Sequence, residues 1–171
     1  VCSSDLDMMV DTKVERGGEV AEVDADGSYK QVEGEKMGTL AVRVSGSKGE
    51  RRVVMKVAGD VNAYGMETLG RIVGNSEAVK MGYSGAKVNQ DCMAVVKFDA
   101  EAELGLDARR RMKRPFSAWR NVLARQMVMG DMTAEHVYGH DVGNERNEEV
   151  DAACTAAYRM AEADMPIEHE G

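Results

Sequence analysis

Two short segments of the chain alternate apolar and polar residues, and this pattern constrains their secondary structure strongly. Residues 40–44 are Leu-Ala-Val-Arg-Val, and residues 53–57 are Val-Val-Met-Lys-Val. A period of two residues is typical of a β-strand with one apolar face. A Gly- and Ser-rich segment joins the two strands, so we expect an antiparallel hairpin. Its second face, with Arg43, Arg52 and Lys56, would lie in water or on an anionic ligand.

Further strands are expected on both sides of this hairpin. Residues 20–24 and 29–33 flank Asp24-Ala25-Asp26-Gly27, and an Asp-Gly step suits the tight turn of a hairpin. Residues 92–98 alternate again, which predicts another strand in the same sheet. Six glycines punctuate residues 59–85. We therefore expect only short helices there, over residues 66–73 and 76–81.

The C-terminal part of the chain has helical patterns. One helix is expected from about residue 99 to the position before Pro115, since proline opposes continuation of a helix. A second is expected over residues 117–129, and its apolar stripe consists of Trp119, Val122, Leu123 and Met127. Thr133 would cap a short helical turn through Tyr138. A last helix would begin after Asn144, with Val150, Ala153, Cys154, Ala157, Tyr158 and Ala161 on its apolar face.

These segments predict an α+β fold, in which an antiparallel sheet from the N-terminal half is packed by three or four C-terminal helices. A chain of 171 residues fits one domain by length, and we assign residues 19–171 to it. Residues 1–18 are expected to be a disordered lead-in. Residues 1–6 resemble the translation of a sequencing adapter and are treated as non-native.

The charge of the whole chain limits what it binds. The formal net charge is −8 and the isoelectric point is near 5.0, which argues against a protein that coats nucleic acid or an anionic membrane along its whole surface. The sequence contains no apolar run of the ~20 residues that a membrane span needs. Its three cysteines form no CxxC pair, which favours reduced thiols. We expect a cytoplasmic protein without a membrane partner.

One segment departs from this acidic background. Arg109, Arg110, Arg111, Lys113, Arg114, Arg120 and Arg125 place seven cations within 17 residues that contain no acid. Guanidinium groups bind phosphate oxygens in a forked geometry, so this basic segment is a candidate contact for DNA or RNA. Residues 131–171 contain 11 acidic residues and two basic ones. The alternative is therefore that the arginines pair with this acidic tail, within one chain or between copies.

His136 and His140 are the candidate metal ligands. Their spacing of four residues would place both imidazoles on one side of a helix, as helical metal sites require. Val137 stands where a zincin helix has Glu, and Gly139 interrupts the turn. Their alternative role is that of ordinary surface or capping histidines.

We expect from these patterns a non-catalytic accessory protein that contacts nucleic acid, or its protein machinery, through the basic segment. No cofactor is expected, because the sequence contains neither a P-loop nor a GxGxxG motif after a strand. One alternative is a structural protein whose copies assemble as a homo-oligomer through the basic segment and the acidic tail. The other is a metal-dependent hydrolase at His136 and His140.

Overall fold

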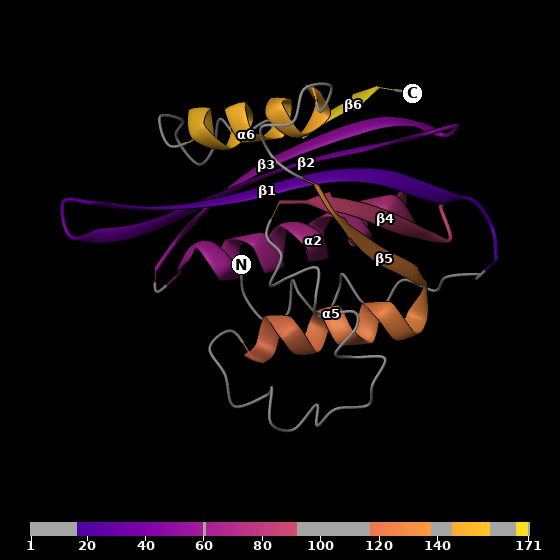
Figure 1. Cartoon of the computed structure of the whole chain (residues 1–171), viewed down its shortest axis with the longest axis horizontal. Helices are drawn as coiled ribbons and strands as arrows, with labels where there is room; N and C mark the ends of the chain where they lie inside the picture. Colours follow the sequence, from indigo (N-terminus) through magenta and orange to yellow (C-terminus); the bar gives the residue numbers. More distant parts are fainter. Residues whose placement is uncertain (1–16, 60, 92–116, 138–144, 158–166, 171) are drawn as a thin grey trace.

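The computed structural model describes residues 17–59, 61–91, 117–137, 145–157 and 167–170. The strands in these ranges are β1 (Val20–Val32), β2 (Glu35–Gly46), β3 (Gly49–Ala58), β4 (Gly85–Gln90), β5 (Asp131–His136) and β6 (Ile167–Glu170). The helices are α2 (Ala63–Lys80), α5 (Ser117–Met129) and α6 (Glu145–Ala157). The six strands form one sheet in the order β5-β4-β1-β2-β3-β6 (Figure 1).

The sheet is mixed, so the predicted antiparallel sheet is wrong. Strands β1, β2, β3 and β6 pair antiparallel, whereas β4 pairs in parallel with both β1 and β5. A strand that joins a sheet in parallel is reached through a crossover connection. The chain crosses over between the end of β3 and the start of β4, and helix α2 lies in this connection. Strands and helices therefore alternate along the second half of the described chain, instead of separating into an N-terminal sheet and C-terminal helices.

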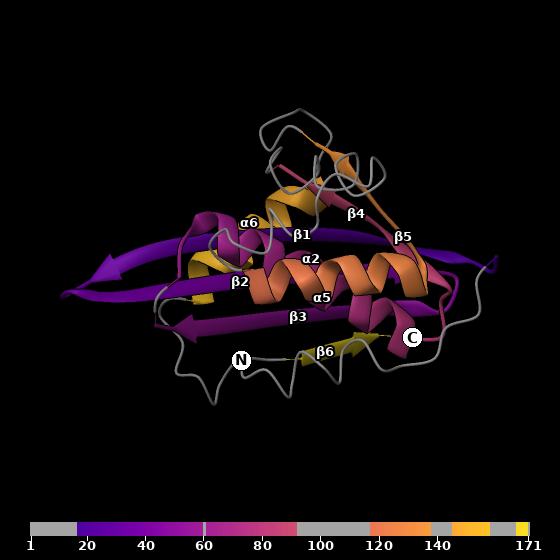
Figure 2. The same cartoon turned by 90° about the horizontal axis from the view of Figure 1, so that it is seen from below.

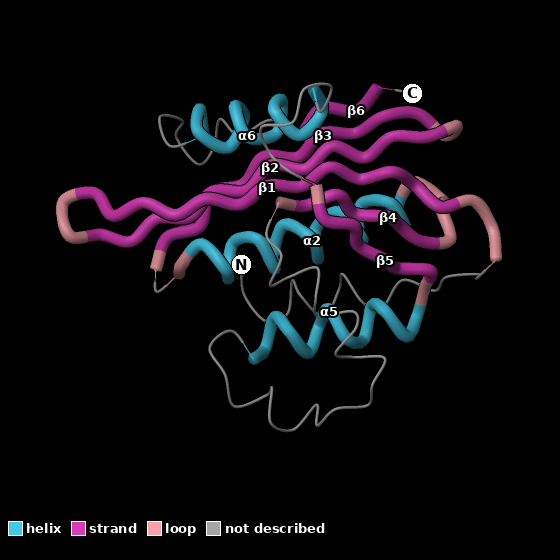
Figure 3. The backbone as a smooth tube through the Cα atoms, viewed as in Figure 1, coloured by secondary structure: helices cyan, strands magenta, loops and turns pink. Residues whose placement is uncertain are grey.

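The described helices cover both faces of the sheet. Helix α2 packs on β1, β2 and β4, and α5 packs against α2. Helix α6 packs on the opposite face, over β1, β2 and β3 (Figures 1 and 3). Figure 2 shows α5 lying along α2 with the sheet behind them. The expected packing of all helices on one apolar face is therefore also wrong.

The core lies between the sheet and α2. Val23 pairs with Val44, and Ala25 pairs with Val42. All four side chains are buried together with Leu40. The predicted hairpin over residues 40–44 and 53–57 is confirmed, since β2 and β3 pair antiparallel over these residues. Alternation predicted it correctly because its apolar face does contact the core.

Helix α2 is continuous from Ala63 to Lys80, so the prediction of two short helices is wrong. Its glycines bring the helix close to the sheet instead of ending it. A Cβ atom at Gly74 would lie 2.6 Å from Val23 Cγ1. Asn62 caps the N-terminus of this helix, and its side chain accepts a hydrogen bond from Gly65 N at 2.8 Å.

The predicted turn at Asp24-Ala25-Asp26-Gly27 is wrong, because all four residues lie inside β1. The chain reverses at Glu33 and Gly34, whose φ angles of 51° and 83° suit a hairpin turn. Gly27 has a different role. A Cβ atom there would lie 2.5 Å from Glu67 N, so glycine allows α2 to approach β1.

The predicted helix over residues 117–129 is confirmed as α5, with Val122 and Leu123 buried against the core. The last helix is confirmed over Glu145–Ala157. The helical turn predicted from Thr133 is wrong, because this residue lies in the parallel strand β5.

Several predictions lie outside the described residues. They are the strand over 92–98, the helix from residue 99 to Pro115, most of the lead-in over residues 1–18, and the Trp119 side chain. No helix in the described ranges combines the length and apolar character of a membrane span.

Candidate metal centre

Three carboxylates from different elements meet beside the junction of β1 and β4. Asp26 lies in β1, Glu67 lies in α2, and Asp91 directly follows β4. One carboxylate oxygen of each residue lies within 4.8 Å of those of the other two. Asp26 and Glu67 are only 4% and 6% exposed, whereas Asp91 is exposed. The cluster therefore joins two buried carboxylates to one at the surface.

The parallel pairing of β1 and β4 brings two of these residues together. Asp24 pairs with Asn89 at the end of the ladder between the two strands. Asp26 lies two residues after Asp24, and Asp91 lies two residues after Asn89, so both reach the same level of the sheet. Ligands of open α/β sheets bind outside the carboxyl ends of parallel strands, and Asp91 follows such an end.

Glu67 is held from two sides. Its Oε1 accepts a hydrogen bond from Gly27 N at 3.1 Å. The buried Gln90 side chain, at the end of β4, donates from Nε2 to the Glu67 carbonyl oxygen at 2.9 Å. The helix turn that carries Glu67 is thus fixed to both strands that carry the other two carboxylates.

Burial and proximity change the acidity of this cluster. Burial is the main cause that raises the pKa of Asp26 above its ordinary 3.8, and a hydrogen bond with Asp151 adds to it. Burial also raises the pKa of Glu67 above its ordinary 4.5, followed by the charge of Asp26. Removing carboxylates from water and placing them together disfavours their charged forms. A bound cation would reverse this preference, because its charge stabilises the carboxylates.

The residues of the cluster fit a hard divalent cation. Carboxylate oxygens are the ligands of Mg²⁺, Mn²⁺ and Ca²⁺. Glu67 Oε2 is buried and has no hydrogen-bond partner among the described residues. A buried polar atom without a partner is costly, and coordination to a cation would satisfy it. Asp26, Glu67 and Asp91 are therefore the candidate metal ligands.

A fourth carboxylate approaches from the opposite face of the sheet. Asp151 lies in α6 and is exposed, and its carboxyl group is close enough to Asp26 to raise the pKa of that residue. Helix α6 packs on the strand that contains Asp26. The acidic centre therefore combines groups from β1, α2, the end of β4 and α6.

Of the predicted histidine pair, the structure describes only His136, which lies on a strand and not on a helix. His136 is the last residue of β5, and its Nε2 lies 3.1 Å from the Asp91 carbonyl oxygen. It therefore lies beside the acidic centre, although it is not one of the clustered ligands. His140 lies outside the described residues.

Most of the predicted nucleic-acid contacts also lie outside the described residues. This applies to Arg109, Arg110, Arg111, Lys113 and Arg114 and to the side chain of Arg120. Arg125 is exposed on α5.

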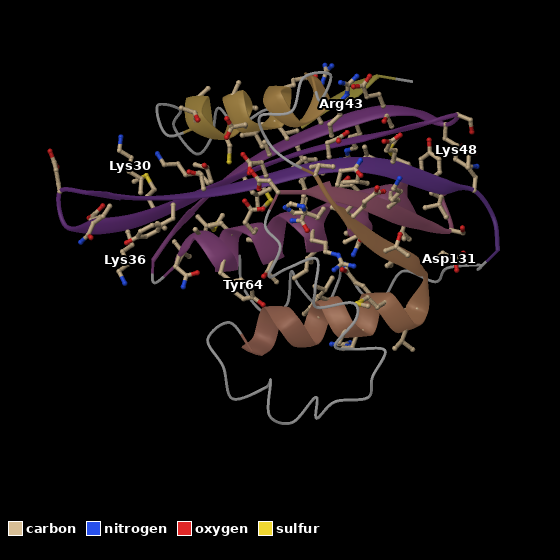
Figure 4. All side chains as sticks on the ribbon, viewed as in Figure 1. Lys30, Lys36, Arg43, Lys48, Tyr64 and Asp131 are labelled. Atoms are coloured by element: carbon tan, nitrogen blue, oxygen red, sulfur yellow. The ribbon has the colours of Figure 1, made fainter. Side chains whose placement is uncertain are left out.

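The cationic face of the hairpin is occupied by acidic side chains. Arg43 forms ion pairs with Glu50 and with Glu149 of α6, the latter at 2.8 Å (Figure 4). Arg52 also pairs with Glu149, at 2.8 Å. The expectation that these two arginines face water or an anionic ligand is wrong, because α6 from the acidic tail lies over them.

The candidate metal ligands were missed because each has an ordinary local context. Asp26 precedes glycine, a step typical of turns, and Glu67 lies in a helix of mixed polarity. One local signal was present. Asp24 and Asp26 alternate with buried Val23 and Ala25, so they mark a strand with carboxylates on one face.

No protein-family model matches the sequence, and no curated protein matches it. Solved structures share its fold. The crystal structure of the prototype foamy virus protease-reverse transcriptase matches with a TM-score of 0.67 and 18% identity, over 82% of this chain and 21% of that one. The chain thus spans about a fifth of that enzyme.

Two smaller proteins match over nearly their whole length. RNase H1 from the halophilic archaeon Halobacterium salinarum gives a TM-score of 0.55 and 15% identity, over 86% of this chain and 100% of that one. LC11-RNase H1, solved in complex with an RNA/DNA hybrid, gives a TM-score of 0.55 and 12% identity, over 80% of this chain and 94% of that one. The chain therefore has an RNase H-like fold. Its structural neighbours are RNase H domains, and this finding overturns the prediction of a non-catalytic accessory protein.

Proposed function

We propose that this protein is a divalent-cation-dependent nuclease whose centre is formed by Asp26, Glu67 and Asp91, with Asp151 beside them. The observation that carries the proposal is the approach of three carboxylates to within 4.8 Å of one another. The fold supports it, because its neighbours are RNase H domains. The RNA strand of an RNA/DNA hybrid is the proposed substrate, since one neighbour was solved with such a hybrid.

The roles of the residues follow from their burial. Glu67 and Asp26 are buried and would supply preorganised carboxylate oxygens to a bound cation. Asp91 is exposed and lies where a phosphodiester could approach. When bound, divalent cations neutralise charge on the phosphate and activate water for in-line attack. The chain itself holds the carboxylates in place through the hydrogen bonds from Gly27 and Gln90 to Glu67.

We also propose that the basic segment, Arg109 to Arg125, contacts the phosphates of this substrate. Seven cations without an acid among them favour binding to a polyanion despite the negative charge of the whole chain. Each phosphate contact should make the affinity for the substrate more sensitive to salt. Replacing Arg110, Arg111 and Arg114 by Ala should weaken binding and flatten its salt dependence, and an unchanged salt slope would contradict this role.

The nuclease proposal is tested with end-labelled RNA/DNA hybrid, double-stranded RNA, double-stranded DNA and single-stranded RNA. Cleavage of the hybrid should require Mg²⁺ or Mn²⁺ and stop in excess chelator. Asp26→Asn, Glu67→Gln and Asp91→Asn should each reduce the rate by about 100-fold or more, since even outer partners of metal ligands contribute about 10- to 100-fold.

The matched control is Glu135→Gln. Glu135 is an exposed carboxylate on β5 that pairs with Lys87 at 2.7 Å, and exposed pairs contribute little to stability. This variant should cleave like the unmodified protein. Cleavage in excess chelator, or equal loss of activity in Glu135→Gln and Glu67→Gln, would overturn the proposal.

A further inference from the structure

Helix α6 is tied to the sheet by a buried polar contact beside the acidic centre. Thr39 of β2 donates a hydrogen bond from Oγ1 to the Cys154 carbonyl oxygen at 2.9 Å. The same Oγ1 lies 3.2 Å from Cys154 Sγ. Both residues are completely buried. One threonine hydroxyl therefore contacts both the backbone and the side chain of a single turn of α6.

The thiol extends this contact to the strand that carries Asp26. Cys154 Sγ donates to the Asp26 carbonyl oxygen at 3.7 Å. The Thr39 hydroxyl uses its only hydrogen for the Cys154 carbonyl oxygen, so the single hydrogen of the thiol serves both Thr39 Oγ1 and the Asp26 carbonyl oxygen. Burial supports this arrangement, because it raises the pKa of Cys154 to about 12 and keeps the thiol protonated.

Strand register and helix spacing connect this anchor to Asp151. Thr39 pairs with Ser28, and Ala41 pairs with Asp26, so Thr39 and Asp26 share one face of the sheet. On α6, Asp151 precedes Cys154 by three residues, which places the two on adjacent turns of one helix face. Fixing Cys154 on Thr39 therefore fixes the turn that presents Asp151 to Asp26.

Apolar packing alone fixes α6 only weakly. Small side chains meet between α6 and the sheet, among them Ala41, Val54, Val150 and Ala153. A pocket of about 270 Å³ lies between β2, β3 and α6. An incompletely filled layer allows a helix to shift, whereas a directional hydrogen bond sets its position along the strand.

We propose that Thr39 and Cys154 are positioning residues, which hold Asp151 against Asp26 and so complete the cation-binding centre. This inference rests on the proposed function, because it takes the acidic centre to be a cation-binding site. Neither residue needs to touch the cation or the substrate.

The test measures Mn²⁺ affinity by calorimetry, without nucleic acid. Thr39→Val keeps the shape of the side chain and removes the hydroxyl, so Mn²⁺ affinity should fall by about 10- to 100-fold, as for other groups that orient metal ligands. Thr39→Ser keeps the hydroxyl and should restore most of the affinity. In an Asp151→Asn background, Thr39→Val should cause no further loss, because the residue that it positions is already changed.

Cys154→Ala serves as a second variant if Thr39→Val does not fold. It keeps the bond to the Cys154 carbonyl and removes both thiol contacts, so a smaller loss in the same direction is expected. Unchanged affinity in the folded variants, or an equal loss with and without Asp151, would overturn the positioning role. An unmodified protein that neither binds Mn²⁺ nor cleaves nucleic acid would instead overturn the proposed function.

Discussion

The backbone amide of Gly27 donates a hydrogen bond to Glu67 Oε1 at 3.1 Å, directly beside the Asp26 carboxylate. The two residues are 40 positions apart in sequence. Their contact requires α2 to approach β1 so closely that only glycine fits at position 27. A Cβ atom there would lie 2.5 Å from both Glu67 N and the Met66 carbonyl carbon. The same glycine therefore makes room for the helix and holds its carboxylate.

Gly27→Ala should separate α2 from β1. The added methyl group would collide with backbone atoms, which cannot rotate away, so we expect a loss of about 1–3 kcal/mol in the free energy of unfolding. Mn²⁺ affinity should fall as well, because Glu67 moves away from Asp26. Urea denaturation and calorimetry measure the two effects.

Gly70→Ala is the matched control in the same helix. A Cβ atom at Gly70 would lie 3.6 Å from the Asp26 carbonyl oxygen, which is an ordinary contact. Alanine favours a helix over glycine by about 1 kcal/mol, so this variant should be as stable as the unmodified protein or more so. Equal destabilisation by both substitutions would contradict the assigned role of Gly27.

Divalent cations should stabilise the fold. A ligand that binds only the folded state adds about 2.7 kcal/mol when its concentration is 100 times its dissociation constant. The thermal midpoint should therefore rise with Mn²⁺ concentration in the unmodified protein and stay constant in Asp26→Asn. A midpoint that rises equally in Asp26→Asn would place the cation elsewhere.

The stability of the metal-free protein should fall as the pH rises above the ordinary carboxyl range. In the unfolded chain Asp26 and Glu67 titrate near 3.8 and 4.5, whereas the fold raises the pKa of both. Above these values the folded state binds more protons than the unfolded state, so the free energy of unfolding decreases with pH. Urea denaturation in chelator, between about pH 5 and pH 8, measures this slope.

The double variant Asp26→Asn, Glu67→Gln removes both titrating groups and should flatten the slope. Saturating Mg²⁺ should reduce it as well, because the cation replaces the protons. A stability that rises with pH throughout this window in chelator would contradict the raised pKa values.

A buried amide pair joins α5 to α2. Asn75 Nδ2 donates to Gln126 Oε1 at 3.1 Å, and Gln126 Nε2 donates to the Ile72 carbonyl oxygen at 3.1 Å. Gln126→Met would remove both hydrogen bonds from a buried place and deprive the Asn75 amide of this acceptor, which should cost about 1–3 kcal/mol. Val128→Ala on the same helix is the control, since Val128 is 75% exposed. Equal thermal midpoints for the two variants would contradict the role of Gln126.

The sequence allowed correct prediction of those elements whose signal is local. The hairpin over residues 40–44 and 53–57 alternates because its two faces meet different environments. The stripe of Val122, Leu123 and Met127 in α5 follows helical spacing because one side of that helix packs on α2. Each of these patterns arises because the apolar residues of one or two neighbouring elements contact the core.

The parallel strands were not predictable in this way. β4 contains only six residues, Gly-Ala-Lys-Val-Asn-Gln, and it lies between β1 and β5, which are distant in sequence. Its polar side chains are stabilised by that position: Asn89 Nδ2 donates to Glu22 Oε1 at 3.2 Å, and Gln90 binds α2. Propensity carries no information about such distant partners.

The acidic centre was missed for the same reason. An Asp-Gly step is a frequent turn signal, and here the glycine is required by a helix that is 40 residues away. Asp91 and Asp151 have the appearance of surface residues until the sheet brings them near Asp26. Their proximity to Asp26 depends on strand and helix contacts that exist only in the tertiary structure.

The tie between Cys154 and the Asp26 carbonyl joins positions 128 residues apart. Contacts of this range form late, because a long loop must close before they are made. The acidic centre should therefore be absent from partly folded or truncated chains, and it should appear only when α6 docks. Cation binding would then be coupled to the final step of folding. Under the proposed function, a chain emerging during synthesis would not cleave nucleic acid until α6 had joined the sheet.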